Sequence, residues 1–126
     1  MDYKNFGDFI TQKRCEKEIT MRQLATELDV SAPFLSDVEK DRRNPFDIEK
    51  LEIVAKFLEL SDEDRNIMMD LAGKKRETVA PDLPAYIMGR DYVCTALRTA
   101  RDLGASEKEW QKFIDDLIKR KRKKGK

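Results

Sequence analysis

Residues Thr20 to Pro45 read TMRQLATELDVSAPFLSDVEKDRRNP, and this stretch decides the fold. Thr20 and Gln23 have the spacing of a capping box, in which each side chain accepts a hydrogen bond from the backbone N–H of the other residue. The box predicts a helix that begins here and continues to about Leu28. Asp29 then stands where the chain must turn sharply, because aspartate tolerates the left-handed backbone conformation better than most residues.

A second helix is expected almost at once. Ser31 is an N-cap residue, and Pro33 lies in the first helical turn, where its missing backbone N–H costs little. We therefore expect a helix over roughly residues 32–40, with Val30 and Leu35 packed against each other at its start. The stretch as a whole predicts two short helices joined by a very short turn.

Further helices are expected on both sides of this pair. Asn5 can cap a first helix that ends near Lys17, Asp47 can cap a fourth, and Ser61 can open a fifth that Gly73 stops. Apolar residues recur in these segments at helical spacing, and no segment alternates with the period of two that a half-buried strand requires. The sequence therefore predicts an all-α protein.

The composition changes between Gly73 and Pro84 to basic residues and prolines with few apolar anchors, which is typical of a linker. Beyond it we expect two amphipathic helices, the first ended by Gly104 and the second opened by Ser106 with Glu109. The turn between them is very short, so they should form an antiparallel hairpin with exposed apolar faces. The expected organisation is a five-helix domain over 1–73, a linker over 74–84, and a helical hairpin with a basic tail over 85–126.

Composition limits the kinds of function. Of the 126 residues, 40% are hydrophobic and 8% aromatic, enough for a compact helical core but with little reserve for a large ligand cavity. Histidine is absent and Cys15 and Cys94 lie far apart, so we expect no metal, no cofactor and reduced thiols in the cytoplasm. No glycine-rich phosphate loop or pair of nucleophile and base indicates an enzyme, and no segment indicates a signal peptide or membrane span. We therefore expect recognition at a surface.

Charge is distributed unevenly along the chain. Residues 1–74 hold 12 basic and 17 acidic side chains, whereas residues 75–126 hold 14 basic and 8 acidic ones. The last eight positions, KRKRKKGK, are a solvated helix end, an aid to non-specific DNA affinity or an expression artefact. An acidic body argues against a protein that coats nucleic acid indiscriminately, because such binding requires broad neutralisation of phosphates. A protein that reads a sequence needs only a local basic edge.

From Thr20 to Pro45 the pattern resembles the helix-turn-helix of the Cro and lambda-repressor type, known as the XRE family. The resemblance extends over about residues 5–72 and implies a five-helix lambda-repressor-like DNA-binding domain whose third helix enters the major groove. A small side chain at Ala25 lets that helix cross close to the one before it. The matching residues are Thr20, Leu24, Ala25, Leu28, Val30, Ser31, Leu35, Val38, Glu39 and Pro45.

The resemblance also implies which residues face the bases. The family's base-reading positions fall on Ala32, Pro33 and Asp37, with Phe34 and Ser36 nearby. The first three include no Arg, Gln or Asn, so bidentate contacts to guanine or adenine are not available from them. The apolar members can meet thymine methyl groups, and Ser36 can reach a phosphate or a base. Asp37 either accepts a hydrogen bond from cytosine or pairs locally with one of the two arginines that follow the helix.

Phosphate contacts and one internal ion pair are implied as well. The family grips the flanking phosphates from the start of the second helix and from beyond the third. Here those positions are Thr20, Arg22, Gln23, Lys40, Arg42 and Arg43, and Ser31 is a further expected DNA-contacting residue. Arg14 and Glu39 match a charged pair that joins the first helix to the end of the recognition helix. We assign this pair an orienting role, because burying two charges offsets most of their attraction.

The helices after the linker carry the apolar residues expected at an interface, namely Val93, Leu97, Trp110, Phe113, Ile114 and Leu117. We therefore expect a cytoplasmic regulator that binds double-stranded DNA as a homodimer and represses transcription at a palindromic operator, with half-sites about 34 Å apart. One alternative is an antitoxin that autoregulates its operon and binds a toxin through the hairpin, a surface that would also suit an antirepressor. Another is an adaptor that has kept the fold and lost base recognition.

Overall fold

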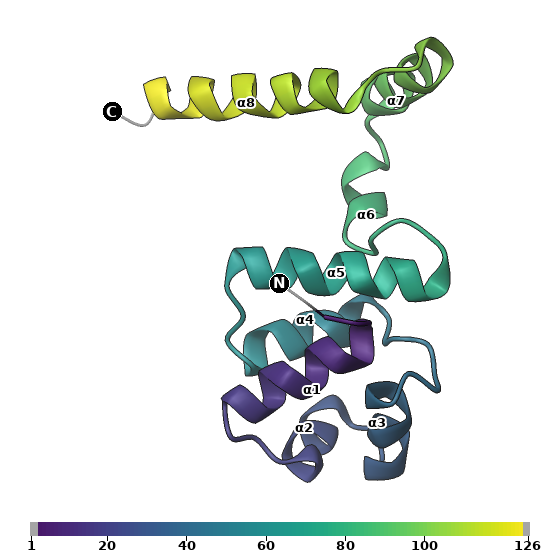
Figure 1. Ribbon diagram of the computed structural model, residues 1–126, viewed down its shortest axis with the longest axis vertical. Coiled ribbons are helices and arrows are strands. Elements are labelled where there is room, and N and C mark those ends of the chain that lie inside the picture. The colour runs from purple at the N-terminus through teal and green to yellow at the C-terminus, as the bar shows by residue number, and fades with distance from the viewer. Residues whose placement is uncertain (1–2, 125–126) are drawn as a thin grey trace. The chain divides into compact units, whose positions relative to one another are not determined.

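The computed structural model describes residues 3–124, and within them every regular element is an α-helix (Figure 1). The predicted all-α class is confirmed. The chain separates into two compact units, one ending at Tyr86 and one beginning at Ile87. None of the helices within the described residues is both long enough and apolar enough to cross a membrane. The helices are α1 (Phe6–Glu16), α2 (Met21–Leu28), α3 (Ala32–Glu39), α4 (Ile48–Phe57), α5 (Asp62–Arg76), α6 (Leu83–Ile87), α7 (Asp91–Leu103) and α8 (Glu107–Lys124).

Each of the first five helices begins at the cap residue that the sequence predicts. The side chains of Asn5, Thr20, Ser31, Asp47 and Ser61 each accept a hydrogen bond from the backbone N–H three residues further on. Such a cap satisfies one of the N–H groups that lack an intrahelical partner, and it contributes about 1 kcal/mol. The helix starts in this unit are therefore set by residues adjacent in sequence.

The same five helices end through an acidic residue in the left-handed conformation, with φ between 52° and 63°. After α3, the N–H of Asp41 donates to the carbonyl oxygen of Val38 at 3.1 Å, and the N–H of Arg42 donates to that of Asp37 at 2.8 Å. This pair of bonds is the Schellman motif, which usually has glycine at the left-handed position. The residues in that position are Glu18, Asp29, Asp41, Glu59 and Glu77.

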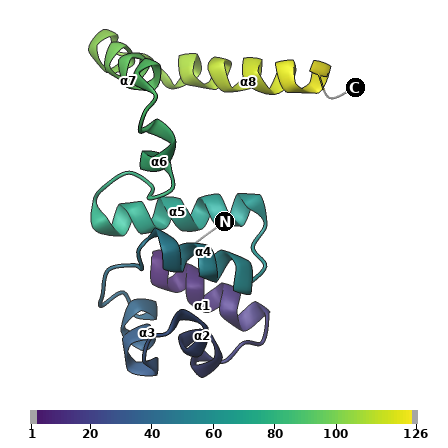
Figure 2. The same ribbon diagram turned by 180° about the vertical axis from the view of Figure 1, so that it is seen from behind.

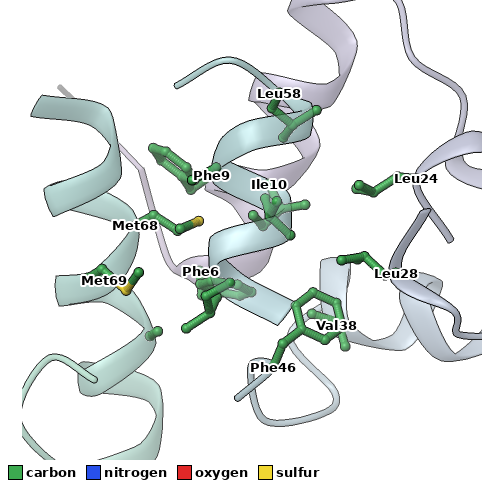
Figure 3. Close-up of a cluster of buried hydrophobic side chains, with 14 of the residues drawn as sticks. Phe6, Phe9, Ile10, Leu24, Leu28, Val38, Phe46, Leu58, Met68 and Met69 are labelled. Atoms are coloured by element: carbon green, nitrogen blue, oxygen red, sulfur yellow. The ribbon is translucent and has the colours of Figure 1, made fainter. Parts of the chain in front are cut away.

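The core of the first unit is built around α1. Phe6, Phe9 and Ile10 are at most 2% exposed and share one cluster with side chains of α2, α3, α4 and α5 (Figure 3). Full burial of an apolar side chain of this size stabilises the fold by roughly 1.5–3 kcal/mol. Within the unit, α2 and α3 lie at one end and α5 at the opposite end (Figures 1 and 2). The other buried members include Leu24, Ala25, Leu28, Leu35, Val38, Phe46, Leu51, Val54, Leu58, Met68, Met69 and Ala72.

Lys13 on α1 is a buried charge that the sequence did not reveal. Its ammonium group lies 3.0 Å from the carboxylate of Asp64 on α5, and it also lies over the rings of Tyr3 and Phe9. Desolvation lowers the pKa of Lys13, but hydrogen bonds to Asp64 and Tyr3 together outweigh it and raise the pKa above its ordinary value. The lysine therefore stays charged and joins α1 to α5.

The prediction that Gly73 stops the fifth helix is wrong, because α5 continues to Arg76. A Cβ at position 73 would lie 2.8 Å from the backbone carbonyl carbon of Val79. The missing side chain lets the segment after α5 fold back against the helix, where Ala80 is buried in the core. The predicted linker over 74–84 therefore includes the last residues of α5, the buried Ala80 and the start of α6.

The second unit consists of two amphipathic helices joined by a short turn, as predicted. Gly104 ends α7 in the left-handed conformation with φ 68°, and Ser106 and Glu109 cap each other's backbone N–H at the start of α8. The apolar faces of the two helices remain largely exposed, with Leu97 on α7 at 43% and Phe113 on α8 at 55%. Between them lies a shallow hollow of about 230 Å³, lined by Ala96, Ala100, Ala105, Glu109, Trp110 and Phe113.

Candidate nucleic-acid interface

One face of α3 is buried and the other is open. Leu35 and Val38 point into the core and are at most 1% exposed. Ala25 on α2 is also buried, and its small side chain lets α3 cross close by. Pro33 is exposed, whereas the other four residues predicted to lie at or near the base-reading positions are half-buried: Ala32, Phe34, Ser36 and Asp37.

Gly7 fixes the contact between α1 and the end of α3. A Cβ at this position would lie 2.6 Å from the carbonyl oxygen of Val38 and closer still to that of Glu39. Because both atoms belong to the backbone, only glycine allows the two helices to approach this closely. Sequence reasoning missed Gly7, since a glycine inside a helix gives no indication of which distant segment it touches.

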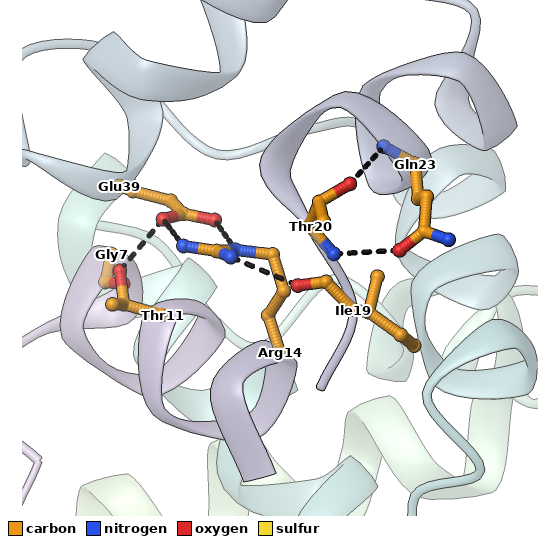
Figure 4. A network of polar contacts seen from close by, with 7 residues as sticks. All are labelled: Gly7, Thr11, Arg14, Ile19, Thr20, Gln23 and Glu39. Atoms are coloured by element: carbon orange, nitrogen blue, oxygen red, sulfur yellow. Dashed lines mark hydrogen bonds and ion pairs between the residues drawn. The ribbon is translucent and has the colours of Figure 1, made fainter. Parts of the chain in front are cut away.

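The predicted pair of Arg14 and Glu39 is present and bidentate (Figure 4). Arg14 donates from Nε to Glu39 Oε2 at 2.9 Å and from Nη2 to Oε1 at 3.0 Å, while Nη1 donates to the carbonyl oxygen of Ile19 at 2.9 Å. Thr11 donates to the same carboxylate, whose side chain is only 4% exposed. The hydrogen bond to Glu39 raises the pKa of Arg14. The network ties α1, α3 and the segment before α2 together, which fits an orienting role.

The start of α2 is held by the predicted capping box (Figure 4). The N–H of Gln23 donates to Thr20 Oγ1 at 3.1 Å, and the N–H of Thr20 donates to Gln23 Oε1 at 2.7 Å. These two predicted DNA-contacting side chains therefore also fix the helix start, and both are exposed beside Arg22. Ser31 is exposed as well and caps α3. Helix starts of this kind present N–H groups and a positive dipole end to phosphates.

Asp37 pairs with both arginines that follow α3. Its Oδ1 lies 3.9 Å from Nη1 of Arg42, and its Oδ2 lies 3.7 Å from Nε of Arg43. Of the two alternatives for Asp37, the local ion pair is thus the one found in the free protein. Both arginine side chains are more than half exposed, and Lys40 beside them is exposed too.

Arg43 also rests on an aromatic side chain. Its guanidinium carbon lies 4.6 Å from the centre of the Phe34 ring, a cation–π distance. Phe34 in turn stacks on Phe46 with ring centres 6.3 Å apart, and Phe46 is buried in the core. Phe34 is therefore a fixed support for Arg43, in addition to lying beside the base-reading positions.

Two residues of the predicted linker hold the loop that carries these arginines. Lys75 donates to the backbone carbonyl oxygen of Asp41 at 3.1 Å and pairs with its carboxylate at 3.1 Å. Arg76 donates to the backbone carbonyl oxygen of Pro45. The loop over 41–45 is thus anchored to the end of α5. A basic run after a helix is usually solvated, so no local signal could have identified these contacts.

The residues predicted for dimerisation lie in the second unit and are largely open to solvent. Val93 is half-buried, and the other five are between 38% and 55% exposed. Trp110 and Phe113 contact each other edge to face, with ring centres 6.1 Å apart. These other five are Leu97, Trp110, Phe113, Ile114 and Leu117.

Comparison with known proteins agrees with this geometry. Residues 10–64 match the family model described as helix-turn-helix. A chain of the solved complex of the SinR protein and the SinI protein is similar to this one at 24% identity and a TM-score of 0.47, over 93% of this chain and 98% of that chain. A TM-score this low gives the likeness no weight for function. No protein of curated function matches the sequence.

The half-buried α3, the capped α2 before it and the family match together define a DNA-binding regulator of transcription of the helix-turn-helix class. Within that class, residues 10–64 have the helix-turn-helix of the XRE family, the Cro and lambda-repressor type. The resemblance carried by the stretch from Thr20 to Pro45 is thereby confirmed, together with the lambda-repressor-like fold.

Proposed function

We propose that this regulator is a repressor that binds a palindromic operator as a homodimer. The observation that carries the proposal is the open face of α3 together with the exposed cations near it. Arg22 is exposed at the start of α2, and Lys40, Arg42 and Arg43 are exposed directly after α3. Phosphate contacts from these residues would fix the register and orientation of a helix in the major groove.

The acidic balance of the domain is compatible with this role, because much of it lies away from α3. α5 opens with three acidic residues and lies at the far end of the unit from α2 and α3 (Figure 1). Counterion release depends on the cations next to the DNA rather than on net charge. The domain can therefore be acidic overall and still bind a polyanion at one edge.

The homodimer is supported by the exposed apolar side chains of the second unit. Monomeric proteins rarely expose large contiguous apolar patches, and those that exist are often interaction sites. The charges of α8 favour a second copy as the partner: residues 107–116 hold four acidic and two basic residues, whereas residues 119–122 are all basic. Two α8 helices packed antiparallel would set the acidic part of each against the basic part of the other.

A dimer would present two copies of α3 to one face of the duplex. Helix-turn-helix dimers bind half-sites about 34 Å apart, one turn of B-DNA, so the operator would be an inverted repeat. Occlusion of a promoter would follow from occupancy alone, in the cytoplasm and without catalysis or a cofactor.

Selection of bound fragments from the parent genome, followed by footprinting, tests the proposal. We expect an inverted repeat with half-site centres about 10 base pairs apart, overlapping a promoter, and a dimer in sedimentation equilibrium. Equal affinity for selected and random duplex at physiological salt would instead indicate an adaptor that has lost base recognition.

An antitoxin is the second candidate, because the same exposed face suits a different protein such as a toxin or an antirepressor. Sedimentation of the purified chain separates the two cases. A stable dimer favours the repressor, whereas a monomer that forms a stoichiometric complex with the product of a neighbouring gene favours the antitoxin.

A further inference from the structure

We infer that Asp37 is a specificity-determining residue. Its carboxylate restrains Arg42 and Arg43 in the free protein and opposes binding to generic duplex DNA. Tight binding then requires a base step that offers the carboxylate a hydrogen-bond donor. The inference rests on the proposed function, because it concerns the same interface.

The charge on the open face of α3 has the wrong sign for indiscriminate DNA binding. Within α3 the two charged residues are Asp37 and Glu39, and Glu39 is buried against Arg14. Asp37 is therefore the formal charge that α3 itself presents toward DNA, and it is negative. Duplex DNA carries about one negative charge per 1.7 Å of helix axis, so most sites repel this carboxylate.

The contacts of Asp37 restrain the arginines without locking them. Its oxygens lie 3.9 Å and 3.7 Å from the guanidinium nitrogens of Arg42 and Arg43. Charge-assisted hydrogen bonds are shorter, about 2.7–2.9 Å, so these are loose ion pairs that a phosphate can displace. The backbone bond from the Arg42 N–H to the Asp37 carbonyl oxygen, at 2.8 Å, keeps the carboxylate and the loop close together. Each arginine is thus partly neutralised until a competing anion arrives.

Phe34 has a different effect on the same loop. The ring supports the Arg43 guanidinium at 4.6 Å and is itself fixed by Phe46. An aromatic face positions a cation without cancelling its charge. When Arg43 is released from Asp37, Phe34 therefore still holds it beside the end of α3. Phe34 positions Arg43 in this way whatever the sequence of the duplex.

The chemistry of the major groove determines where the restraint is lifted. Cytosine N4 and adenine N6 are amino donors that a carboxylate can accept from, whereas guanine and thymine present acceptors at the corresponding edge. An amino donor on the base that faces Asp37 forms a hydrogen bond with the carboxylate. Arg42 and Arg43 are then free to contact phosphates. Every base pair carries one such amino group, so the orientation of the pair decides the outcome. Where guanine or thymine faces Asp37, the carboxylate is desolvated against an acceptor, which penalises binding.

The test compares Asp37→Asn with Asp70→Asn, a control that removes the same charge from an exposed position in α5 at the far end of the unit. Affinities for a random duplex and for a duplex selected by the wild-type protein are measured by fluorescence anisotropy over a series of salt concentrations. We expect Asp37→Asn to bind the random duplex at least about fivefold more tightly, and its preference for the selected duplex to fall about tenfold. The salt dependence for random duplex should steepen by about 0.9 for each arginine freed to a phosphate.

Other results would overturn the inference. If Asp37→Asn matches Asp70→Asn on random duplex, the carboxylate has no restraining role; if it weakens binding to both duplexes, Asp37 merely positions the arginines. Phe34→Leu serves as a second variant, expected to weaken binding to both duplexes while keeping their ratio. Failure of the proposed function is a separate result, in which the wild-type protein shows no preference for any duplex. Thermal melts of each variant establish that the fold is retained.

Discussion

Replacing Gly7 by alanine is expected to destabilise the protein, although alanine is the better helix former. A Cβ at this position would lie 2.6 Å from the carbonyl oxygen of Val38. The obstructing atoms belong to the backbone at the end of α3, so no change of side-chain rotamer can relieve the overlap. α1 would have to move away from α3.

The expected change in the free energy of unfolding has one stabilising and two destabilising contributions. Alanine in place of glycine inside a helix gains about 1 kcal/mol. Forcing an extra methyl group into a close-packed contact costs about 1–3 kcal/mol. Separation of the two helices also loosens the bidentate pair of Arg14 and Glu39, and hydrogen bonds to charged groups contribute about 1.5–3 kcal/mol each. We expect a net loss of about 2 kcal/mol in the free energy of unfolding.

Urea denaturation of wild type and Gly7→Ala measures this loss directly. Asp70→Ala, at an exposed site within α5, is a control in which alanine enters a helix without meeting another backbone, and it should raise stability slightly. Affinity for a selected duplex should also fall in Gly7→Ala, because the displaced contact carries the end of α3. An unchanged or higher free energy of unfolding in Gly7→Ala would refute the reasoning.

Three further predictions concern the DNA-facing loop, the second unit and the helix ends. Arg42→Ala combined with Arg43→Ala should weaken binding to every duplex and reduce the salt dependence by about 0.9 per lost phosphate contact; an unchanged slope in anisotropy titrations would count against their role. Trp110→Ala should dissociate the dimer, since truncating an interface hot spot costs at least about 2 kcal/mol; a dimer that persists in sedimentation at the same concentrations would exclude this face. Glu18→Gly should raise the free energy of unfolding by roughly 0.5–1 kcal/mol, because a left-handed conformation strains any residue with a Cβ; lower stability in urea would show that the glutamate makes a compensating contact.

The signals that could be read from sequence were the local ones. The caps at Thr20 and Ser31 act over three residues, so their consequences appear directly in the pattern of residue types. The family resemblance added one long-range contact, the pair of Arg14 and Glu39, which spacing alone left undecided. The outer face of α3 followed from the same pattern, because its buried residues recur at helical spacing.

What could not be predicted depends on which segments meet in space. Gly73 looks like a helix stop in sequence. In the structure its missing side chain leaves room for the backbone of Val79, six residues later. α6 has five residues, too few to show a periodic pattern, and none of them is buried. The role of Asp37 was left as two alternatives, because the position of the loop after α3 depends on its Schellman motif, with an aspartate where glycine is usual.

The anchoring of the loop over 41–45 bears on how this protein can be divided for experiment. The sequence suggests that the domain stops at Gly73. A fragment cut there would lack Lys75 and Arg76, which hold the loop, and Ala80, whose methyl group is buried in the core. Its arginines would then sample many positions, and weak DNA binding would be mistaken for a poor groove fit. A fragment that extends through Asp82, whose carboxylate lies 3.8 Å from the guanidinium group of Arg65, keeps these contacts. The DNA affinity of this longer fragment would then depend on how α3 and its loop contact the duplex.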